Sequence, residues 1–239
     1  METKTLSITS TPKVIMISGA ARGMGSAIAK KFYDENWCVS LGMRTPQMPE
    51  WATDESRILV DHYDALDDTT ETKWVENTVK HFGHLNAIVA NAGIGIWKNV
   101  IDISENEMND LIDVHIKSPR RLVKAAWQQL IACGSGRVVM IGSLSSKRVY
   151  DSDSGPYAIS KFATLALAHS IRHTGFEYGI RASTICPGFV KTDMVDGMMP
   201  DLNMTPPQEI ARVAHFLVTS PNEVSISEIP VNCRAEESF

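Results

Sequence analysis

The sequence predicts a doubly wound α/β fold, in which a parallel sheet carries helices on both faces. Short apolar runs rich in β-branched residues alternate with longer amphipathic stretches along the 239 residues. The runs are apolar on both faces for much of their length, which is typical of buried parallel strands. A hydrophobic content of 44% and a charged content of 21% fit one soluble domain. We therefore expect a single domain over residues 1–239, with frayed ends at 1–12 and 233–239.

The strands are expected where the apolar runs are shortest and richest in β-branched residues. These runs are Val14 to Ser18, Cys38 to Leu41, Arg57 to Val60, Ala87 to Ala90, Arg137 to Gly142 and Arg181 to Cys186.

Helix start signals lie between and after the predicted strands. Ser104 and Glu107 form a capping box, and the sequence from Thr205 places Pro206 at a first helical position. Long helices are expected near residues 104–133 and 157–175. The segment TPQMPEWATDES contains two prolines, so we expect no full crossover helix between the second and third strands.

Composition excludes several classes of function. The net charge is −5 and no basic block stands out, so a nucleic acid is not an expected partner. The four cysteines are far apart without a CxxC spacing, which predicts reduced thiols and no metal site. No stretch approaches the length of a membrane span, so we expect a cytoplasmic protein without a membrane partner.

A glycine-rich loop, SGAARGMG, directly follows the first predicted strand and precedes an alanine-rich helix. Gly19, Gly23 and Gly25 allow a tight turn and a close approach of the backbone to a ligand. The helix N-terminus offers N–H groups and a positive dipole to a phosphate. The loop therefore predicts dinucleotide binding, with a structural turn as the alternative.

Tyr157 and Lys161 lie four residues apart in GPYAISK, which places them on one face of a helix. An ammonium close to a phenol stabilises the phenolate, so we expect a lowered pKa for Tyr157 and a role in proton transfer. Taken alone the pair is a weak signal, because chance supplies such spacings.

Six motifs in order now resemble the short-chain dehydrogenase/reductase family: the glycine loop, Asn91-Ala92-Gly93, Ser143, Tyr157, Lys161 and the run PGFVKT from Pro187 to Thr192. The resemblance covers residues 14 to about 195. It implies a Rossmann-type fold and an NAD(P)-dependent oxidoreductase that interconverts a carbonyl and an alcohol. The small-molecule partner is then a ketone, an aldehyde or an alcohol.

The resemblance also implies roles for individual residues. Tyr157 would be the general acid or base, Lys161 would lower its pKa and bind the nicotinamide ribose, and Ser143 would hold the substrate oxygen. The expected catalytic residues are Ser143, Tyr157, Lys161 and His115. The expected cofactor-binding residues are Gly19, Arg22, Gly23, Met24, Gly25, Arg44, Asp64, Asn91, Ala92, Gly93, Tyr157, Lys161, Pro187, Gly188, Val190 and Thr192. Among them, Asn91 would fix the loop beside the adenosine ribose and Asp64 would contact the adenine.

The choice of nicotinamide cofactor depends on the end of the second strand. Met43 stands where the family's acid would bind a ribose 2′-OH, and Arg44 follows it. Together with Arg22 this gives two guanidiniums and no carboxylate, which favours the 2′-phosphate of NADP(H). NAD(H) is the alternative if both arginines are solvated surface residues.

His115 falls where the family has a fourth catalytic residue, an asparagine whose main-chain carbonyl binds a relay water. Pro119, four residues later, has no N–H to occupy that carbonyl. We therefore expect the His115 carbonyl to be free and kinked toward Lys161. The imidazole either transfers protons itself or fills the asparagine's space as a packed ring.

Three further points stay open at this stage. The segment LSSKRVYDSDSGP forms either a polar substrate rim or a solvated loop, and a C-terminal glycine pair found in the family is absent. The resemblance implies a homo-oligomer, a tetramer or a dimer. The predicted helix 157–175 supports it, because this helix has more apolar residues than one buried face requires. A non-catalytic dinucleotide-binding sensor or scaffold and an NAD-dependent alcohol dehydrogenase are the alternative functions.

Overall fold

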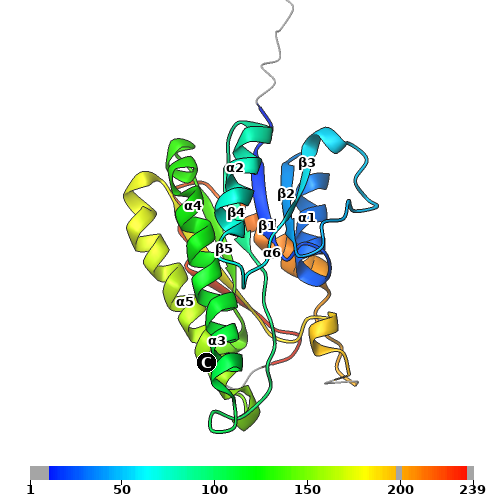
Figure 1. Ribbon diagram of the computed structural model, residues 1–239, viewed down its shortest axis with the longest axis vertical. Coiled ribbons are helices and arrows are strands. Elements are labelled where there is room, and N and C mark those ends of the chain that lie inside the picture. The colour runs from blue at the N-terminus through cyan, green and yellow to red at the C-terminus, as the bar shows by residue number, and fades with distance from the viewer. Residues whose placement is uncertain (1–10, 198–200, 236–239) are drawn as a thin grey trace, which may run out of the picture.

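The computed structural model describes residues 11–197 and 201–235. Within them, seven strands form one sheet in the order β3-β2-β1-β4-β5-β6-β7, and every neighbouring pair is parallel (Figure 1). The strands are β1 Val14–Ser18, β2 Cys38–Met43, β3 Ile58–His62, β4 Ala87–Ala90, β5 Arg137–Ile141, β6 Arg181–Pro187 and β7 Glu228–Val231. The doubly wound α/β fold is thereby confirmed.

All six predicted strands are present, and their ends differ from the prediction by at most two residues. The seventh, β7, was not predicted because it is short and contains Pro230. It pairs with β6 alone, so it is an edge strand, where a residue without an N–H is tolerated. The predicted frayed ends lie mostly outside the described residues.

Six α-helices cover the two faces of the sheet in the described part of the chain. They are α1 Gly23–Asp34, α2 Thr70–Phe82, α3 Glu105–Ile112, α4 Ser118–Ala132, α5 Gly155–Gly175 and α6 Pro207–Thr219. The expected capping box starts α3 at Ser104. Helix α6 begins one residue later than predicted, because Pro206 has the extended backbone of an N-cap and Pro207 is the first helical residue. Between β2 and β3 the chain forms only a short 3₁₀ turn, Glu55–Arg57, as the prolines predicted.

The core has two layers, one on each face of the sheet, and β1 shows why. Ile15 and Ile17 pack with buried residues of α1 and α6, whereas Val14 and Met16 pack with those of α2, α4 and α5. The alternation follows from the pleat, because successive side chains of a strand point to opposite faces. Both faces of the central strands are therefore apolar, as expected for a covered parallel sheet.

The chain reverses its winding direction between β1 and β4, which are neighbours in the sheet. Loops that follow parallel strands meet at one edge of the sheet, and ligands of such folds bind at this edge near the reversal. The loops after β1, β4, β5 and β6 carry the glycines of the first loop, Asn91, Ser143 and Gly188. The fold thus gathers the motifs that are far apart in the sequence.

Candidate active site

Tyr157 lies in the first turn of α5 and is 8% exposed. Its hydroxyl is hydrogen-bonded to the side chain of Ser143, which follows β5. Two rings enclose the phenol: the Trp97 ring centroid is 4.9 Å away, and the His115 ring meets it edge-on at 5.7 Å. The phenol is therefore held in a fixed position with its oxygen directed to Ser143.

The pKa of Tyr157 corrects an expectation from the sequence. Burial raises this pKa to about 12, and the hydrogen bond from Ser143 offsets only part of the rise. The Lys161 ammonium lies 5.6 Å from the centroid of the phenol ring and donates to the Ile141 carbonyl at 3.1 Å. The net pKa of Tyr157 is raised in this structure, because desolvation outweighs the effects that favour the phenolate.

Lys161 is itself buried, one helical turn beyond Tyr157 as the spacing predicted. Desolvation lowers the pKa of its ammonium to about 8. A small cavity of about 10 Å³ lies beside it, and His115 and Thr164 contribute to the walls. This volume is close to that of one bound water.

The backbone at His115 differs from an ordinary helix in the way that Pro119 predicted. The chain passes through a π-helical turn, Asp113–Lys117, between α3 and α4. The expectation of a free carbonyl was wrong, however. The His115 carbonyl accepts a hydrogen bond from the Thr164 hydroxyl of α5 at 3.1 Å, and that hydroxyl is shared with the Ser160 carbonyl at 3.0 Å. The His115 carbonyl thus contacts the neighbouring helix.

The His115 ring has a defined tautomer. Its Nε2 accepts the backbone N–H of Ile94 at 3.1 Å, so this nitrogen carries no proton. The Ser160 hydroxyl donates to the Tyr157 carbonyl at 2.7 Å, so Nδ1, which is 2.8 Å from Ser160 Oγ, must be the donor of that contact. Burial holds the pKa of His115 well below its ordinary value. Both nitrogens are occupied within the fold, which favours the packed ring over proton transfer.

The glycine loop has the close backbone approach that a phosphate cradle needs. Gly19 has a φ of +66° and Gly23 a φ of +56°, values that favour glycine. A Cβ on Gly25 would lie 2.2 Å from the Gly19 carbonyl oxygen. Asn91 fixes this loop as expected, because its side-chain amide donates to the Ser18 carbonyl at 3.0 Å and to the Gly19 carbonyl at 3.2 Å. These residues fit a dinucleotide.

The two arginines singled out for a 2′-phosphate have different surroundings. Met43 is buried in the core and Arg44 is the first exposed residue after β2, so a cation occupies the end of this strand. The Arg44 carbonyl accepts from His62 if the Nδ1 of that ring is protonated. Arg22 is paired with Asp193 at 2.8 Å, with exposed side chains on both residues. This pair joins the glycine loop to the loop after β6 and was not predicted.

A cavity of about 280 Å³ lies in front of Tyr157 and Ser143. The predicted residues Met24, Pro187, Gly188, Val190 and Thr192 line it. The walls also contain side chains that the sequence analysis did not assign to the site, among them Trp97, Leu144, Phe189 and Asn232. Arg148, Tyr150 and Asp151 of the segment after Ser143 lie at the cavity too, which favours the substrate rim over a solvated loop.

The cavity residues that were not predicted have no motif in the sequence that would identify them. Trp97 follows the loop after β4 at no fixed spacing, and Asn232 follows a strand that was itself not predicted. The Asn232 side chain lies against the loop after β6, because a Cβ on Gly188 would lie 2.6 Å from its Oδ1. The Gly188 N–H donates to the Val231 carbonyl at 2.8 Å, so the C-terminal strand supports this loop.

Two features are absent from the described residues. No helix among them is long and apolar enough to cross a membrane. Residues 11–197 and 201–235 contain no group of three or more His, Cys, Asp or Glu side chains that could hold a metal ion.

Comparison with known sequences gives a consistent family. The family model described as short chain dehydrogenase matches residues 13–203. An agropine synthesis reductase of Rhizobium rhizogenes is 32% identical over 228 residues, which cover 93% of this chain and 53% of that protein. The chain thus spans about half the length of this relative. Oxidoreductase UcpA of Escherichia coli K12 is 28% identical, over 84% of this chain and 78% of that protein.

Solved structures agree in fold. An alcohol dehydrogenase from Thermococcus sibiricus, complexed with 5-hydroxy-NADP, matches with a TM-score of 0.80 and 25% identity over 94% of this chain and 99% of that chain. A 3-ketoacyl-(acyl-carrier-protein) reductase from Brucella melitensis, complexed with NADH, gives a TM-score of 0.85 at 19% identity, over 94% of this chain and 98% of that one. The second likeness concerns the fold alone.

Proposed function

Because the chain belongs to the short-chain dehydrogenase family, we propose that it is an NADP(H)-dependent oxidoreductase that interconverts a carbonyl and an alcohol. The observation that carries the proposal is the buried Tyr157 hydroxyl, hydrogen-bonded to Ser143 at the wall of a cavity and one helical turn from Lys161. A protein that only binds a dinucleotide has no need of this arrangement.

Each of these residues has its own role in the proposed reaction. A bound nicotinamide dinucleotide supplies or accepts the hydride. The hydroxyls of Ser143 and Tyr157 bind the carbonyl oxygen, and the Tyr157 proton moves to that oxygen as the alcohol forms. Lys161, whose pKa of about 8 leaves it charged at pH 7, stabilises the resulting phenolate. The small cavity beside Lys161, which His115 also lines, supports a relay water that restores the proton.

The cavity walls support an apolar substrate of moderate size. Trp97, Leu144, Phe189 and Met194 contribute apolar surface, and the volume is about 280 Å³. Relatives named as agropine synthesis reductases support the reductive direction.

The proposal is tested by titrating the protein with NADPH and NADH and by measuring turnover with a broad panel of ketones, aldehydes and alcohols. Tight binding of a cofactor with turnover of a panel member would support it. Binding without any turnover would favour a dinucleotide-binding sensor or scaffold instead.

We expect the preference for NADPH to depend on Arg44. Replacing Arg44 by alanine should weaken NADPH binding by roughly tenfold and leave NADH binding nearly unchanged, because a forked cation–phosphate contact is lost. Asp193→Asn should have the opposite effect. At low salt this variant should bind NADPH roughly twofold more tightly, because Arg22 loses the carboxylate that competes with the phosphate. Fluorescence titrations measure both effects. Equal affinities for the two cofactors, unchanged in Arg44→Ala, would contradict the preference and favour the NAD-dependent alternative.

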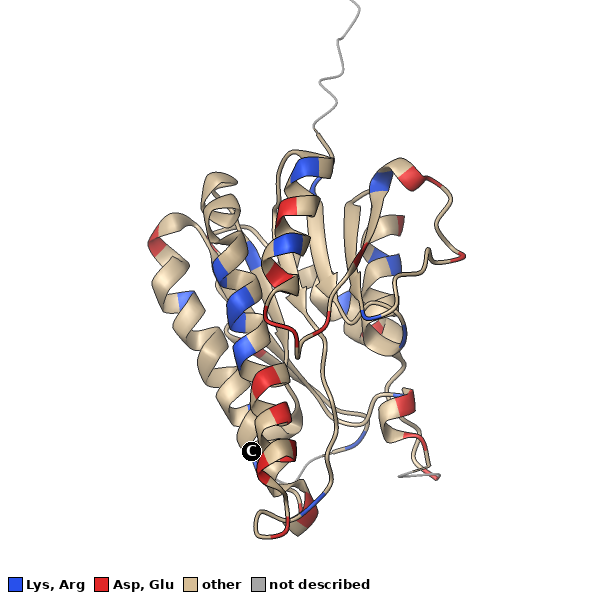
Figure 2. Ribbon diagram, in the orientation of Figure 1, with Lys and Arg blue, Asp and Glu red and all other residues tan. Residues whose placement is uncertain are grey.

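We further propose that the protein forms a homo-oligomer, a dimer or a tetramer, through the surface of α3, α4 and α5. Phe162 on α5 remains 43% exposed, which supports a second apolar face on this helix. Figure 2 shows acidic residues along α3 and basic residues along the first half of α4. An antiparallel arrangement of two copies would bring these opposite charges together. A monomeric mass by light scattering would contradict it.

The cysteines support a reducing compartment. All four are free thiols in the structure, and two of them are buried. We therefore propose a cytoplasmic location, which cell fractionation would check.

A further inference from the structure

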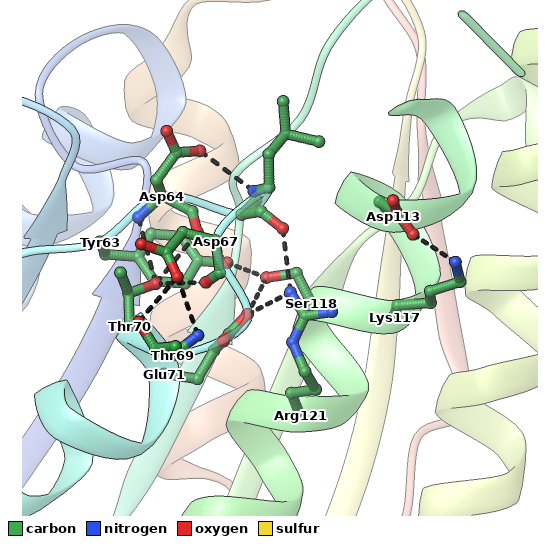
Figure 3. Close-up of polar contacts among 12 residues, drawn as sticks. Tyr63, Asp64, Asp67, Thr69, Thr70, Glu71, Asp113, Lys117, Ser118 and Arg121 are labelled. Atoms are coloured by element: carbon green, nitrogen blue, oxygen red, sulfur yellow. Dashed lines mark hydrogen bonds and ion pairs between the residues drawn. The ribbon is translucent and has the colours of Figure 1, made fainter. Parts of the chain in front are cut away.

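A buried carboxylate lies behind the proposed cofactor site and has no part in the chemistry described so far. Glu71, in the first turn of α2, is 1% exposed. Its Oε1 accepts from the Ser118 hydroxyl at 2.6 Å and from Arg121 Nη2 at 2.8 Å, whereas its Oε2 has no partner among the described residues (Figure 3). Burying a carboxylate costs free energy even when it is paired, and an apolar residue would pack against the sheet at lower cost. Packing alone therefore does not explain why a carboxylate is buried at position 71.

The hydroxyl groups around Glu71 are linked by hydrogen bonds whose donors and acceptors are fixed. Ser118 donates to Glu71, so at its 2.6 Å contact with the Tyr63 hydroxyl it must accept. Tyr63 is also hydrogen-bonded to Ser18, the last residue of β1. The Ser18 oxygen in turn accepts the backbone N–H groups of Asn91 and the residue after it, each at 3.0 Å. Glu71 is thus connected to the loops after β1 and β4.

Arg121 connects the same carboxylate to a third loop. Its Nη2 donates to the Ala65 carbonyl at 3.0 Å, directly beside Asp64, the residue expected to contact the adenine. Figure 3 shows this loop lying against the side chains of Tyr63 and Arg121. The loops after β1, β3 and β4 surround the place where the adenosine half of a dinucleotide binds in this type of sheet. We call Ser18, Tyr63, Glu71, Ser118 and Arg121 the Glu71 network.

The Glu71 network is better suited to fixing the positions of the loops than to transferring protons. Tyr63 and Ser18 do border the small cavity beside Lys161. However, Glu71 Oε1 is ion-paired with Arg121 and accepts a hydrogen bond from the Ser118 hydroxyl, so these contacts hold the carboxylate in place. Burial raises the pKa of Tyr63 to about 12, so this phenol keeps its proton.

We propose that the Glu71 network is a positioning device for the adenosine half of the cofactor. It sets the spacing of the three loops, so its polar groups control cofactor affinity and leave the reacting groups at Tyr157 and Ser143 undisturbed. The inference rests on the proposed dinucleotide site, because it assigns these residues to one half of that site.

Two conservative variants test the network. Tyr63→Phe removes the central hydroxyl and keeps the ring, whose centroid is 5.1 Å from that of Trp74. Glu71→Gln removes the charge and keeps the shape. The Kd for NADPH should rise by roughly fivefold in Tyr63→Phe and by roughly tenfold in Glu71→Gln. The Kd for 2′,5′-ADP, which carries only the adenosine half, should rise by the same factors. At saturating NADPH, kcat should stay within about twofold of the parent value.

The double variant checks that the two residues act through one network. It should bind NADPH about as weakly as Glu71→Gln alone, because coupled residues are not additive. If Glu71→Gln fails to fold, Tyr63→Phe carries the test by itself, because its ring packing is retained.

Ser40→Ala is a matched control for stability. Ser40 in β2 accepts from Trp74 Nε1 at 2.8 Å and contacts the Thr78 hydroxyl at 2.7 Å. It belongs to another buried polar cluster, between β2 and α2, whose hydrogen bonds do not reach the loops. It should lower Tm without changing either Kd. The proposal is overturned if Tyr63→Phe and Glu71→Gln behave like Ser40→Ala, or if they lower kcat while both Kd values stay constant. A parent protein that binds neither NADPH nor NADH would instead contradict the proposed function.

Discussion

Replacing Tyr157 by phenylalanine should lower kcat by about 10²- to 10⁴-fold, the usual contribution of a positioned general acid or base. The ring would remain between Trp97 and His115, since these contacts involve no hydroxyl. Only the proton donor and its hydrogen bond to Ser143 are lost. The Kd for NADPH should therefore stay within about twofold of the parent value. Steady-state kinetics with a substrate found in the panel, together with a cofactor titration, measure both quantities.

His115→Asn is the matched control for this variant, because it changes a ring in contact with Tyr157 without removing a proposed proton donor. Both ring nitrogens are occupied by Ile94 and Ser160, and the carbonyl that faces Thr164 is kept in the variant. We expect kcat to stay within about threefold of the parent, as for a residue outside acid–base chemistry. If His115→Asn were as slow as Tyr157→Phe, the imidazole would have to take part in the proton relay.

Much of the fold and of the site could be predicted because the signals are local. The apolar runs predicted the strands β1 to β6, and the glycine spacing predicted the loop after β1. Tyr157 and Lys161 were found by their spacing on one helix, and the place of Ser143 at the cavity follows from the position of the loop after β5 in a parallel sheet.

The wrong predictions concern properties that depend on contacts between residues far apart in the sequence. The pKa of Tyr157 is raised because the whole fold desolvates the phenol, which its neighbour at i+4 does not reveal. The missing N–H of Pro119 correctly predicted an irregular helix at His115, but Thr164, which bonds to the carbonyl, is 49 residues away. The Glu71 network could not be predicted for the same reason, since Ser118 and Glu71 are 47 residues apart.

Replacing Gly25 by alanine should weaken cofactor binding by about 10²-fold or more and lower Tm. The added Cβ would lie 2.2 Å from the Gly19 carbonyl oxygen and 2.9 Å from its carbonyl carbon. These are backbone atoms, so the clash cannot be relieved by rotating a side chain. The glycine loop must move away from α1, and it then loses the close approach to the helix N-terminus on which phosphate binding depends. Titration with NADPH and a thermal melt measure the two effects.

Gly155→Ala is the control for the loss of a glycine near the site. Gly155 begins α5, its φ is −55°, and no atom lies within 4 Å of the position that its Cβ would take. Alanine there should stabilise the protein by about 0.4–1 kcal/mol, because it reduces the freedom of the unfolded chain and favours the helix. Cofactor affinity should not change. If Gly25→Ala bound NADPH as tightly as Gly155→Ala does, the loop after β1 would not be the phosphate cradle, and the assignment of the cofactor to this edge of the sheet would be wrong.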